Sequence, residues 1–496
     1  MKNKSLWLEN ENEDNCKKLN EDIKCDVLII GGGMTGISTA YHLRNSNLKV
    51  CLVDRNLVGH GITSKTTGKL NYLQELILYK INKYVSKETA KNYLDSQIQA
   101  IKIVEDIINR EQIDCDFIKV PSFLFTNRES EIKKIKKQKE LLESFGIKVD
   151  EHKNIPINIG CKYAISVNDT AVFHPIKYLL KLRDICIKKN ISIYEKTKIT
   201  AISKDENNYI CKTNNDNTII ANKIVIACHY PYFLLPFFMP TKTSIEKSYV
   251  SASKIEEANF FTAINSTNPI KSIRYHKNKK NDYLIYLNGT HKTCNSYDEN
   301  ANFDKLKRDL KRLKLEPQYI WSNHDIMTYD YLPFIGRIEK DNNLLLIGTG
   351  YNTWGMTNGS LAGIVISDII LGNKNKYEDL FDPQRSINTS KVLKYPLYLG
   401  VNAKAFIETK VSKNKPWYKD NIEFRKVDGE NIAIYTSEKN TKHVVYNTCP
   451  HLKCSLIFNE VEKTWDCPCH GSRFNIDGQV ISGPANYDIS YKKELW

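Results

Sequence analysis

The chain has 496 residues, enough for two to four domains with a large buried core, and its composition is that of a globular protein. The net charge of +15 would suit nucleic acid, an anionic membrane or an acidic redox protein. Lys, Asn and Ile are abundant throughout, however, so we interpret the positive charge as spread over the surface.

Three stretches were candidates for targeting or for macromolecular binding. The basic run 133–137 lies in a charged, helix-like region without interleaved aromatic residues, so we expect no nucleic-acid binding. Residues 1–24 are polar and lack the apolar core of a signal peptide. The apolar stretch 224–240 is broken by a histidine and by prolines, so we expect a buried strand there and no transmembrane segment. These features predict a soluble, cytoplasmic protein.

The first elements predicted in chain order are a strand, a glycine turn and a helix. Residues 26–30 are apolar and mostly β-branched, residues 31–36 read Gly-Gly-Gly-Met-Thr-Gly, and residues 37–43 are apolar at helical spacing. This is the context that the G-x-G-x-x-G motif requires for dinucleotide binding. The phosphates would then lie at the N-terminus of the helix, where free N–H groups and the helix dipole favour anions.

The glycines and a following acid have separate expected roles. Gly31 permits a tight turn, Gly33 lets the backbone approach a pyrophosphate, and Gly36 lets the helix pack on the strand. A second apolar strand, 48–53, ends at Asp54, which can accept hydrogen bonds from ribose hydroxyls. On this evidence alone the dinucleotide is NAD or FAD.

A hydroxyl-rich segment, 59–68, follows this acid and favours FAD. Its small residues let the backbone wrap a second phosphate and approach a flat ring. The arrangement resembles the D-amino-acid oxidase and glycine oxidase superfamily of FAD enzymes, in which such a stretch lies along the pyrophosphate and the isoalloxazine. Some relatives carry a histidine here that is linked covalently to the flavin. Lys65 takes that place in this chain, so the resemblance implies non-covalent FAD.

The resemblance recurs downstream in the superfamily's order. The matching motifs are His174-Pro175, the strand 224–227 with Cys228-His229 in place of the usual Thr-Gly, the closing segment 325–350, and the residues around Trp354 that open the last helix. A helix N-terminus aimed at the flavin would stabilise its reduced anion. The FAD-binding residues that the resemblance implies are Gly31, Gly33, Met34, Thr35, Gly36, Asp54, Arg55, Gly61, Thr63, Ser64, Thr67, Gly68, Gly350, Trp354, Gly355, Met356 and Thr357.

The catalytic residues stay unidentified. Amino-acid oxidation would call for an arginine that binds a carboxylate, and Arg274 is a candidate, although a surface ion pair is at least as good an interpretation of it. Tyr249 and Tyr286 are candidate hydroxyl donors, for which a position in the core is the commoner case.

The cysteines divide into two groups. Nine are scattered singly from Cys16 to Cys294 and are typical of small buried hydrophobes in a reducing compartment. The other four crowd into residues 449–469, beside His451 and His470. Such a set can hold zinc. The pattern C-x-H followed by C-x-x-H instead places one thiolate and one imidazole on each of two loops, which is the Rieske arrangement.

This stretch closely resembles the cytochrome bc-type Rieske motif. The resemblance implies that Cys449 and Cys467 bind one iron of a [2Fe–2S] cluster, that His451 and His470 bind the other, and that a disulfide between Cys454 and Cys469 braces the loops. Two departures appear. Lys453 stands where glycine is common, and Phe474 replaces the tyrosine of high-potential members. Losing that hydroxyl predicts a lower potential within the Rieske range of roughly −150 to +300 mV.

The predicted fold is an α/β (α+β) Rossmann-like FAD-binding domain with an antiparallel-sheet substrate domain, followed by a small all-β Rieske domain. The boundaries are 1–390 for the oxidoreductase, with FAD-binding segments at about 25–75, 150–235 and 325–372 and the substrate domain at about 76–149 and 236–324, then 391–414 for a connector and 415–496 for the Rieske domain.

These features predict an FAD- and [2Fe–2S]-dependent oxidoreductase. The resemblance implies oxidation of a C–N bond in an amine or amino acid, and the Rieske domain suggests that electrons leave singly for an external acceptor such as an electron carrier or a quinone. Two alternatives stay open: a reductase that receives electrons through the Rieske domain, and a redox- or iron-responsive sensor.

Overall fold

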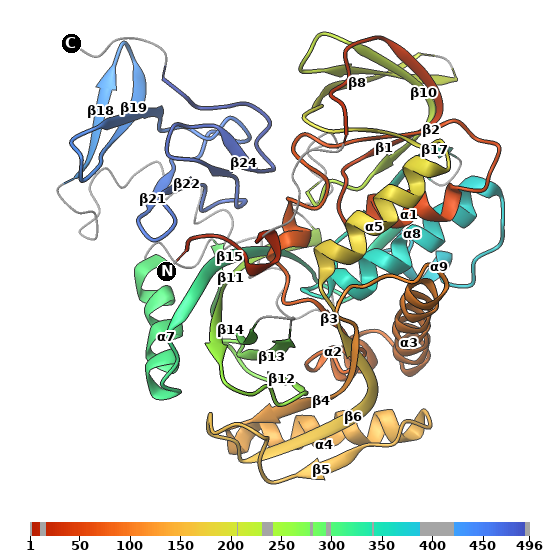
Figure 1. Cartoon of the computed structure of the whole chain (residues 1–496), viewed down its shortest axis with the longest axis vertical. Helices are drawn as coiled ribbons and strands as arrows, with labels where there is room; N and C mark the ends of the chain where they lie inside the picture. The colour runs from red at the N-terminus through yellow and green to blue at the C-terminus, as the bar shows by residue number, and fades with distance from the viewer. Residues whose placement is uncertain are drawn as a thin grey trace.

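A computed structural model of the chain describes residues 2–9, 16–205, 207–230, 242–277, 281–293, 299–339, 342–386 and 421–491. These residues form an eight-stranded sheet, a nine-stranded sheet and a small domain built on two short sheets (Figure 1). The predicted connector, 391–414, lies outside the described residues. The mixed α/β fold followed by an all-β domain confirms the predicted fold class.

The first sheet has the strand order β16-β17-β10-β1-β2-β7, and the five strands from β17 to β7 run parallel. Its strands are β1 (Ile23–Ile30), β2 (Val50–Val53), β7 (Ser192–Tyr194), β8 (Ile199–Asp205), β9 (Asn208–Thr213), β10 (Thr218–Ile226), β16 (Phe334–Glu339) and β17 (Asn342–Thr349). The hairpin β8–β9 pairs with β10.

Both faces of this sheet are covered, which explains why its central strands are continuous apolar runs. In β1, Val27 and Ile29 belong to the core formed with the helices, whereas Leu28 and Ile30 belong to the core on the side of β8 and β9. The helices packed on the first side are α1 (Met34–Leu43), α5 (Pro175–Lys188) and α8 (Gly355–Leu371).

The second sheet has the order β15-β11-β14-β13-β12-β4-β6-β3 and is antiparallel except where β12 pairs with β4. Its strands are β3 (Lys69–Leu70), β4 (Ile118–Thr126), β5 (Asp150–His152), β6 (Tyr163–Val172), β11 (Thr243–Ile255), β12 (Thr262–Asn265), β13 (Ser272–Lys277), β14 (Asp282–Lys292) and β15 (Pro317–Thr328). The helices α4 (Glu129–Ser144) and α7 (Glu299–Arg312) pack on it. Helix α2 (Ile77–Tyr84) packs on α3 (Lys87–Arg110) and α4, α3 also packs on α8, and α9 (Glu378–Phe381) follows α8.

One predicted boundary differs from the observed sheets. Residues from about 150 were expected in the FAD-binding part, yet β5 and β6 belong to the second sheet. The reason lies in long-range pairing, because the buried residues Ala164 and Ile165 of β6 lie opposite Phe125 and Leu124 of β4. The first sheet resumes only after α5.

The C-terminal domain is all β, as predicted. One sheet contains β18 (Ile422–Val427), β19 (Glu430–Thr436) and β20 (Lys442–Tyr446), and the other contains β21 (Ile457–Asn459), β22 (Thr464–Asp466), β23 (Arg473–Phe474) and β24 (Val480–Ser482). The domain lies beside β11 and β15, at one end of the second sheet (Figure 1). In the part of the chain that is described, no helix is both long and apolar enough to cross a bilayer.

Candidate functional site

The glycine turn after β1 admits no larger residue at two positions. Gly31 has φ 113°, and a Cβ there would lie 2.6 Å from the carbonyl oxygen of Ala227. A Cβ on Gly36 would lie 1.9 Å from the carbonyl oxygen of Gly31. Helix α1 then begins at Met34; its N-cap, Gly33, offers no side chain, and the Met34 N–H donates to Thr63 Oγ1 at 3.1 Å. This close-packed turn at a helix N-terminus has the form of a phosphate cradle.

Asp54 follows β2 and braces this turn. Its Oδ2 accepts from the Gly32 N–H and its Oδ1 from the Asn56 N–H, both at 2.7 Å. Burial raises the pKa of Asp54, while these two N–H groups oppose the rise. Each carboxylate oxygen keeps a second lone pair. Its predicted contact with a ribose therefore stays a prediction that this geometry allows.

A cavity of about 420 Å³, called here the first cavity, extends from the glycine turn to the start of α8. It contains ten of the predicted FAD-binding residues: Gly31, Gly33, Met34, Thr35, Asp54, Arg55, Gly61, Thr63, Gly355 and Met356. Helix α8 begins without a side-chain cap, so its first N–H groups are open to a ligand at this end. A cavity that extends between the starts of α1 and α8 fits a dinucleotide such as FAD.

A second cavity of about 530 Å³ lies between α2 and the second sheet. Its lining includes the predicted residues Thr67, Trp354 and Met356. The two cavities share a set of residues near the start of α8, namely Lys65, Thr66, Asn323, Asp325, Thr353 and Met356. A ligand in the first cavity therefore meets a ligand in the second at this junction.

Five predicted FAD-binding residues line neither cavity. They are Gly36, Ser64, Gly68, Gly350 and Thr357. Ser64 Oγ donates to the Gly61 carbonyl at 2.9 Å, and Thr357 Oγ1 accepts from the Asn71 N–H at 3.4 Å, so both stabilise local backbone. The sequence pattern thus did not distinguish residues that line a cavity from residues that support its backbone, and a role of these five in FAD binding stays a prediction.

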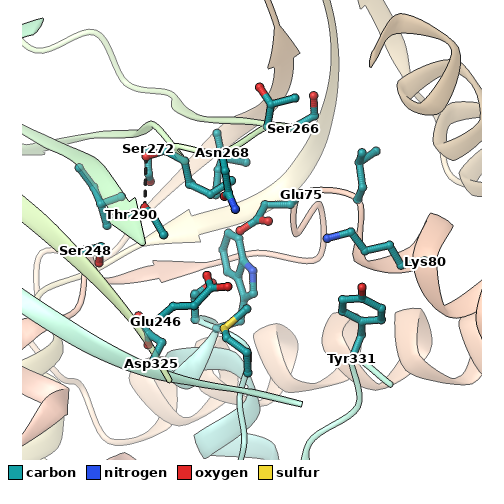
Figure 2. A pocket seen from close by; sticks show the side chains of 18 of the residues that line it. Glu75, Lys80, Glu246, Ser248, Ser266, Asn268, Ser272, Thr290, Asp325 and Tyr331 are labelled. Carbon is teal, nitrogen blue, oxygen red and sulfur yellow. Dashed lines mark hydrogen bonds between the residues drawn. The ribbon is translucent and has the colours of Figure 1, made fainter. Parts of the chain in front are cut away.

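Three carboxyl groups point into the second cavity: those of Glu75, Glu246 and Asp325 (Figure 2). Burial raises the pKa of Asp325 to about 7, and the nearby charges of Glu246 and Glu75 add to that rise. Burial is also the main cause of the raised pKa values of Glu75 and Glu246. The charge of Lys80 opposes the rise for Glu75, and the charges of Lys292 and Lys80 oppose it for Glu246. The acids are therefore close enough to affect one another's ionisation.

Buried polar atoms without hydrogen-bond partners also line the second cavity. Ser248 is 5% exposed and Trp354 is 4% exposed. Ser248 Oγ and Trp354 Nε1 have no partner among the described residues. Because buried polar groups are costly unless they are hydrogen-bonded, these two atoms are suited to bind a ligand.

The three other side chains considered for the substrate pocket lie elsewhere. Arg274 Nη1 donates to three backbone carbonyls, at 2.8, 2.9 and 2.9 Å, and burial lowers its pKa to about 9. Tyr286 Oη donates to Asp309 at 2.7 Å, and Tyr249 packs its ring edge-on against Phe303. None of the three lines the second cavity, so Arg274 supports the backbone near residues 67–68 and does not bind a carboxylate there.

In the C-terminal domain, two loops carry the cysteine–histidine pattern and have matching geometry. The Lys453 N–H donates to the Cys449 carbonyl, and the Gly471 N–H donates to the Cys467 carbonyl, both at 2.9 Å. Lys453 has φ 59° and Gly471 has φ 70°. The loop thus requires a left-handed residue at this point, which explains why glycine is common where this chain has Lys453.

The two predicted histidine ligands face one another across these loops. The ring centroids of His451 and His470 are 5.1 Å apart, with the planes at 88°. Burial lowers the pKa of both imidazoles, that of His470 to about 4. Both Nδ1 atoms are buried without a partner among the described residues. Two neutral rings with unsatisfied nitrogens beside Cys449 and Cys467 fit the Cys₂His₂ donor set of a Rieske cluster.

A disulfide between Cys454 and Cys469 joins the two loops, as the resemblance implied. The sulfurs of Cys454, Cys467 and Cys469 lie within 4.8 Å of one another. Since two of the three are in the disulfide, Cys467 alone is left as a thiolate ligand among them. Ser472 Oγ accepts from the Ala485 N–H at 2.9 Å and thereby ties a third loop to this pair.

The cluster-bearing loops dock against the first domain. Tyr230, which is 6% exposed, lines the first cavity, and its ring centroid lies 6.4 Å from that of His451. A Cβ added at Gly471 would lie 3.2 Å from Ile245 of β11. Tyr230 was not predicted from the sequence, because His451, the residue that it contacts, lies about 220 residues further along the chain and no local pattern links the two.

Comparisons with known proteins agree with both sites. Residues 26–369 match the FAD-dependent oxidoreductase family, and residues 408–491 match the Rieske [2Fe–2S] domain. The chain is 32% identical over 476 residues to YhfW of Bacillus subtilis (strain 168), named as a Rieske 2Fe-2S iron-sulfur protein, with 94% of this chain and 93% of that protein covered.

Two further proteins resemble the part of the chain that precedes the Rieske domain. The chain is 23% identical over 377 residues to γ-glutamylputrescine oxidoreductase of Escherichia coli (strain K12), covering 73% of this chain and 87% of that protein. Glycine oxidase from Geobacillus kaustophilus superimposes with a TM-score of 0.62 at 17% identity, over 74% of this chain and 100% of that one, which shows a shared fold. The chain belongs to the family of FAD-dependent oxidoreductases and carries in addition a Rieske [2Fe–2S] domain, so it is an oxidoreductase whose cofactors are FAD and a Rieske cluster.

Proposed function

We propose that the protein oxidises a C–N bond of an amine or amino acid and exports the electrons through its Rieske domain to an external acceptor. FAD supplies an acceptor for the electron pair as a hydride, and the Rieske cluster carries electrons one at a time. The observation that carries the proposal is the position of Tyr230, which lines the first cavity on one side and contacts His451 on the other.

The residues of the first cavity have distinct proposed tasks. The N–H groups at the start of α1 bind the pyrophosphate, and those at the start of α8 face the flavin edge. Thr63 Oγ1 accepts from the Met34 N–H at 3.1 Å and so holds the 61–68 segment against α1. In the two loops of the Rieske domain, the cluster is held by Cys449, Cys467, His451 and His470.

The second cavity favours an amine over an α-amino acid. Seven lysines but no arginine are among the described residues that line it, and three acids point into it. A carboxylate substrate is usually held by an arginine fork, and an ammonium group is held by carboxylates. Asp325 lies at the junction of the two cavities, where it would orient the nitrogen of the bond to be oxidised. The relative named for γ-glutamylputrescine supports the same choice.

The test is an anaerobic titration of the purified, cofactor-loaded chain with aliphatic amines, diamines and amino acids. Absorption follows the flavin, and EPR follows the reduced cluster. Bleaching of the flavin followed by the reduced-cluster signal is the expected result. Bleaching with a cluster that stays oxidised, although dithionite reduces it, would contradict electron export. If no compound bleaches the flavin but a reduced carrier reduces the cluster and then the flavin, electrons flow in the opposite direction.

A further inference from the structure

One wall of the first cavity comes from the Rieske domain. Residues 479–483, which include β24, line this cavity together with Asp54 and Arg55 after β2 and with Thr197 and Lys198 before β8. In the G-x-G-x-x-G fold, the acid after the second strand marks the ribose of the adenosine half. The Rieske segment therefore borders the adenosine end of the cavity, which Asp54 marks, and not the flavin end at the start of α8.

Two basic side chains of the first domain fix this segment in place. Arg55 Nη2 donates to the Ile481 carbonyl at 2.5 Å, and Lys198 Nζ donates to the Asn486 carbonyl. Both donors also line the first cavity. Arg55 was predicted to bind FAD, and its guanidinium in fact reaches across the cavity edge to the other domain. The wall is thus anchored at two points on the nucleotide-binding domain.

The segment also presents a polar atom that no described residue satisfies. Ser482 lines the first cavity, and its Oγ is buried without a hydrogen-bond partner among the described residues. A hydroxyl is both a donor and an acceptor, so it suits a ribose hydroxyl or an adenine nitrogen. A buried polar group of this kind costs stability unless a ligand pairs with it.

From these observations we infer that the Rieske domain completes the FAD site, with residues 479–483 forming the outer wall of the adenosine end and Ser482 Oγ hydrogen-bonding to the adenosine. FAD is then held by both domains, and its release requires the Rieske domain to move away from Arg55 and Lys198. The domain that receives electrons is in this way also the domain that retains the flavin.

Hydrogen–deuterium exchange on the full chain, with and without FAD, tests the wall directly. Adding FAD to flavin-depleted, cluster-containing protein should slow exchange in peptides covering 479–483 as well as in those covering the glycine turn, 31–36. Peptides covering 426–430, which line neither cavity, serve as the control. Protection of 31–36 with no change in 479–483 would overturn the inference.

Substitutions at Ser482 give an independent measurement, the dissociation constant of FAD from fluorescence of the released flavin. Ser482→Trp fills the cavity and should weaken FAD binding by at least about tenfold, the effect of losing roughly 1.4 kcal/mol. Ser482→Ala should weaken it by about two- to tenfold, as for one hydrogen bond. Lys426→Trp, on an exposed position of β18, is the matched control.

The cluster's EPR signal in each variant shows whether the Rieske domain is intact. Weaker FAD binding in Ser482→Trp and Ser482→Ala with an unchanged cluster signal supports the inference. Unchanged FAD binding in Ser482→Ala, together with an unprotected 479–483 segment, overturns it even if the tryptophan variant fails to assemble its cluster.

Discussion

Lys247 Nζ donates to Asp466 Oδ2 at 2.8 Å, and this bond joins β11 of the oxidoreductase domain to β22 of the Rieske domain. Lys247 exposes no side-chain surface, and its Nζ also lies 3.2 Å from Glu462 Oε2. Arg473 pairs with the same two acids, at 2.7 and 3.2 Å. Buried charges persist only when they are paired, so this network defines one docked position of the Rieske domain.

Removing the lysine should loosen that docking. Lys247→Met removes one of the two cations that pair with the buried Glu462 and Asp466 and leaves Arg473. The loss of one partner from a buried charge pair costs about 3–5 kcal/mol. Thermal unfolding followed by the visible absorption of the cluster should show an earlier transition. Lys254→Met, at an exposed position on the same strand, is the control and should leave the transition unchanged. Equal transitions in the two variants would contradict a docking role for Lys247.

Tyr230 supports a second prediction, which concerns the rate of internal electron transfer. Tyr230→Leu removes the ring that contacts His451 and should slow reduction of the cluster without slowing reduction of the flavin by substrate. Stopped-flow absorption at flavin and cluster wavelengths separates the two steps. Tyr230→Phe keeps the ring and removes a hydroxyl that has no partner among the described residues. This variant should reduce its cluster at the normal rate, and its free energy of unfolding should fall by less than about 1.5 kcal/mol. Normal transfer in the leucine variant would refute the route.

The local motifs of both cofactor sites were predictable from the sequence because their geometry is set by adjacent residues. A Cβ at Gly31 or Gly36 meets backbone atoms, and such constraints appear in the sequence as glycines at fixed spacing. The same holds for the Rieske loops, where ligand spacing and a left-handed residue at position 453 or 471 are local features.

Contacts between distant segments were not predictable in this way. The segment 150–235 was predicted as FAD-binding as a whole, yet β6 within it pairs with β4 of the second sheet, because β4 lies across a helix in the sequence and a strand's pattern does not name its partner. Arg274 was a candidate for the pocket, beside the alternative of a surface ion pair, because it lies in the predicted substrate domain. Its side chain instead donates to the backbone of the turn at 67–68. Residues 479–483 of the Rieske domain line a cavity of the oxidoreductase domain, and a motif confined to one domain cannot predict such a contact.

The disulfide between Cys454 and Cys469 gives a third prediction. It closes a loop with a sequence separation of 15 residues and lies in the core of the Rieske domain. A cross-link of that length is worth about 3 kcal/mol through the unfolded state. The double variant Cys454→Ser, Cys469→Ser should therefore lose its cluster absorption at a lower temperature than the unchanged protein. The control is Cys211→Ser, which replaces a buried free cysteine of the first domain and should leave that temperature unchanged. A cluster equally stable in both variants would show that the disulfide contributes nothing to it.

The last prediction concerns the pH dependence of substrate oxidation. Burial, with a contribution from Glu246, raises the pKa of Asp325 to about 7, so this acid is neutral below that pH and charged above it. Only the charged form attracts an ammonium group, and kcat/KM for a cationic amine should therefore rise as the pH increases through about 7.

Asp325→Asn should remove that rise and lower kcat/KM at pH 8 by about 10- to 100-fold, since a hydrogen bond to a charged group is worth about 1.5–3 kcal/mol. Glu131→Gln is the matched control, because Glu131 lines the same cavity but is paired with Lys134 at 2.7 Å. It should keep both the rate and the pH profile. A rise near pH 7 that survives in Asp325→Asn would assign the ionisation to another group, with Glu246 as the next residue to replace, because burial raises its pKa as well.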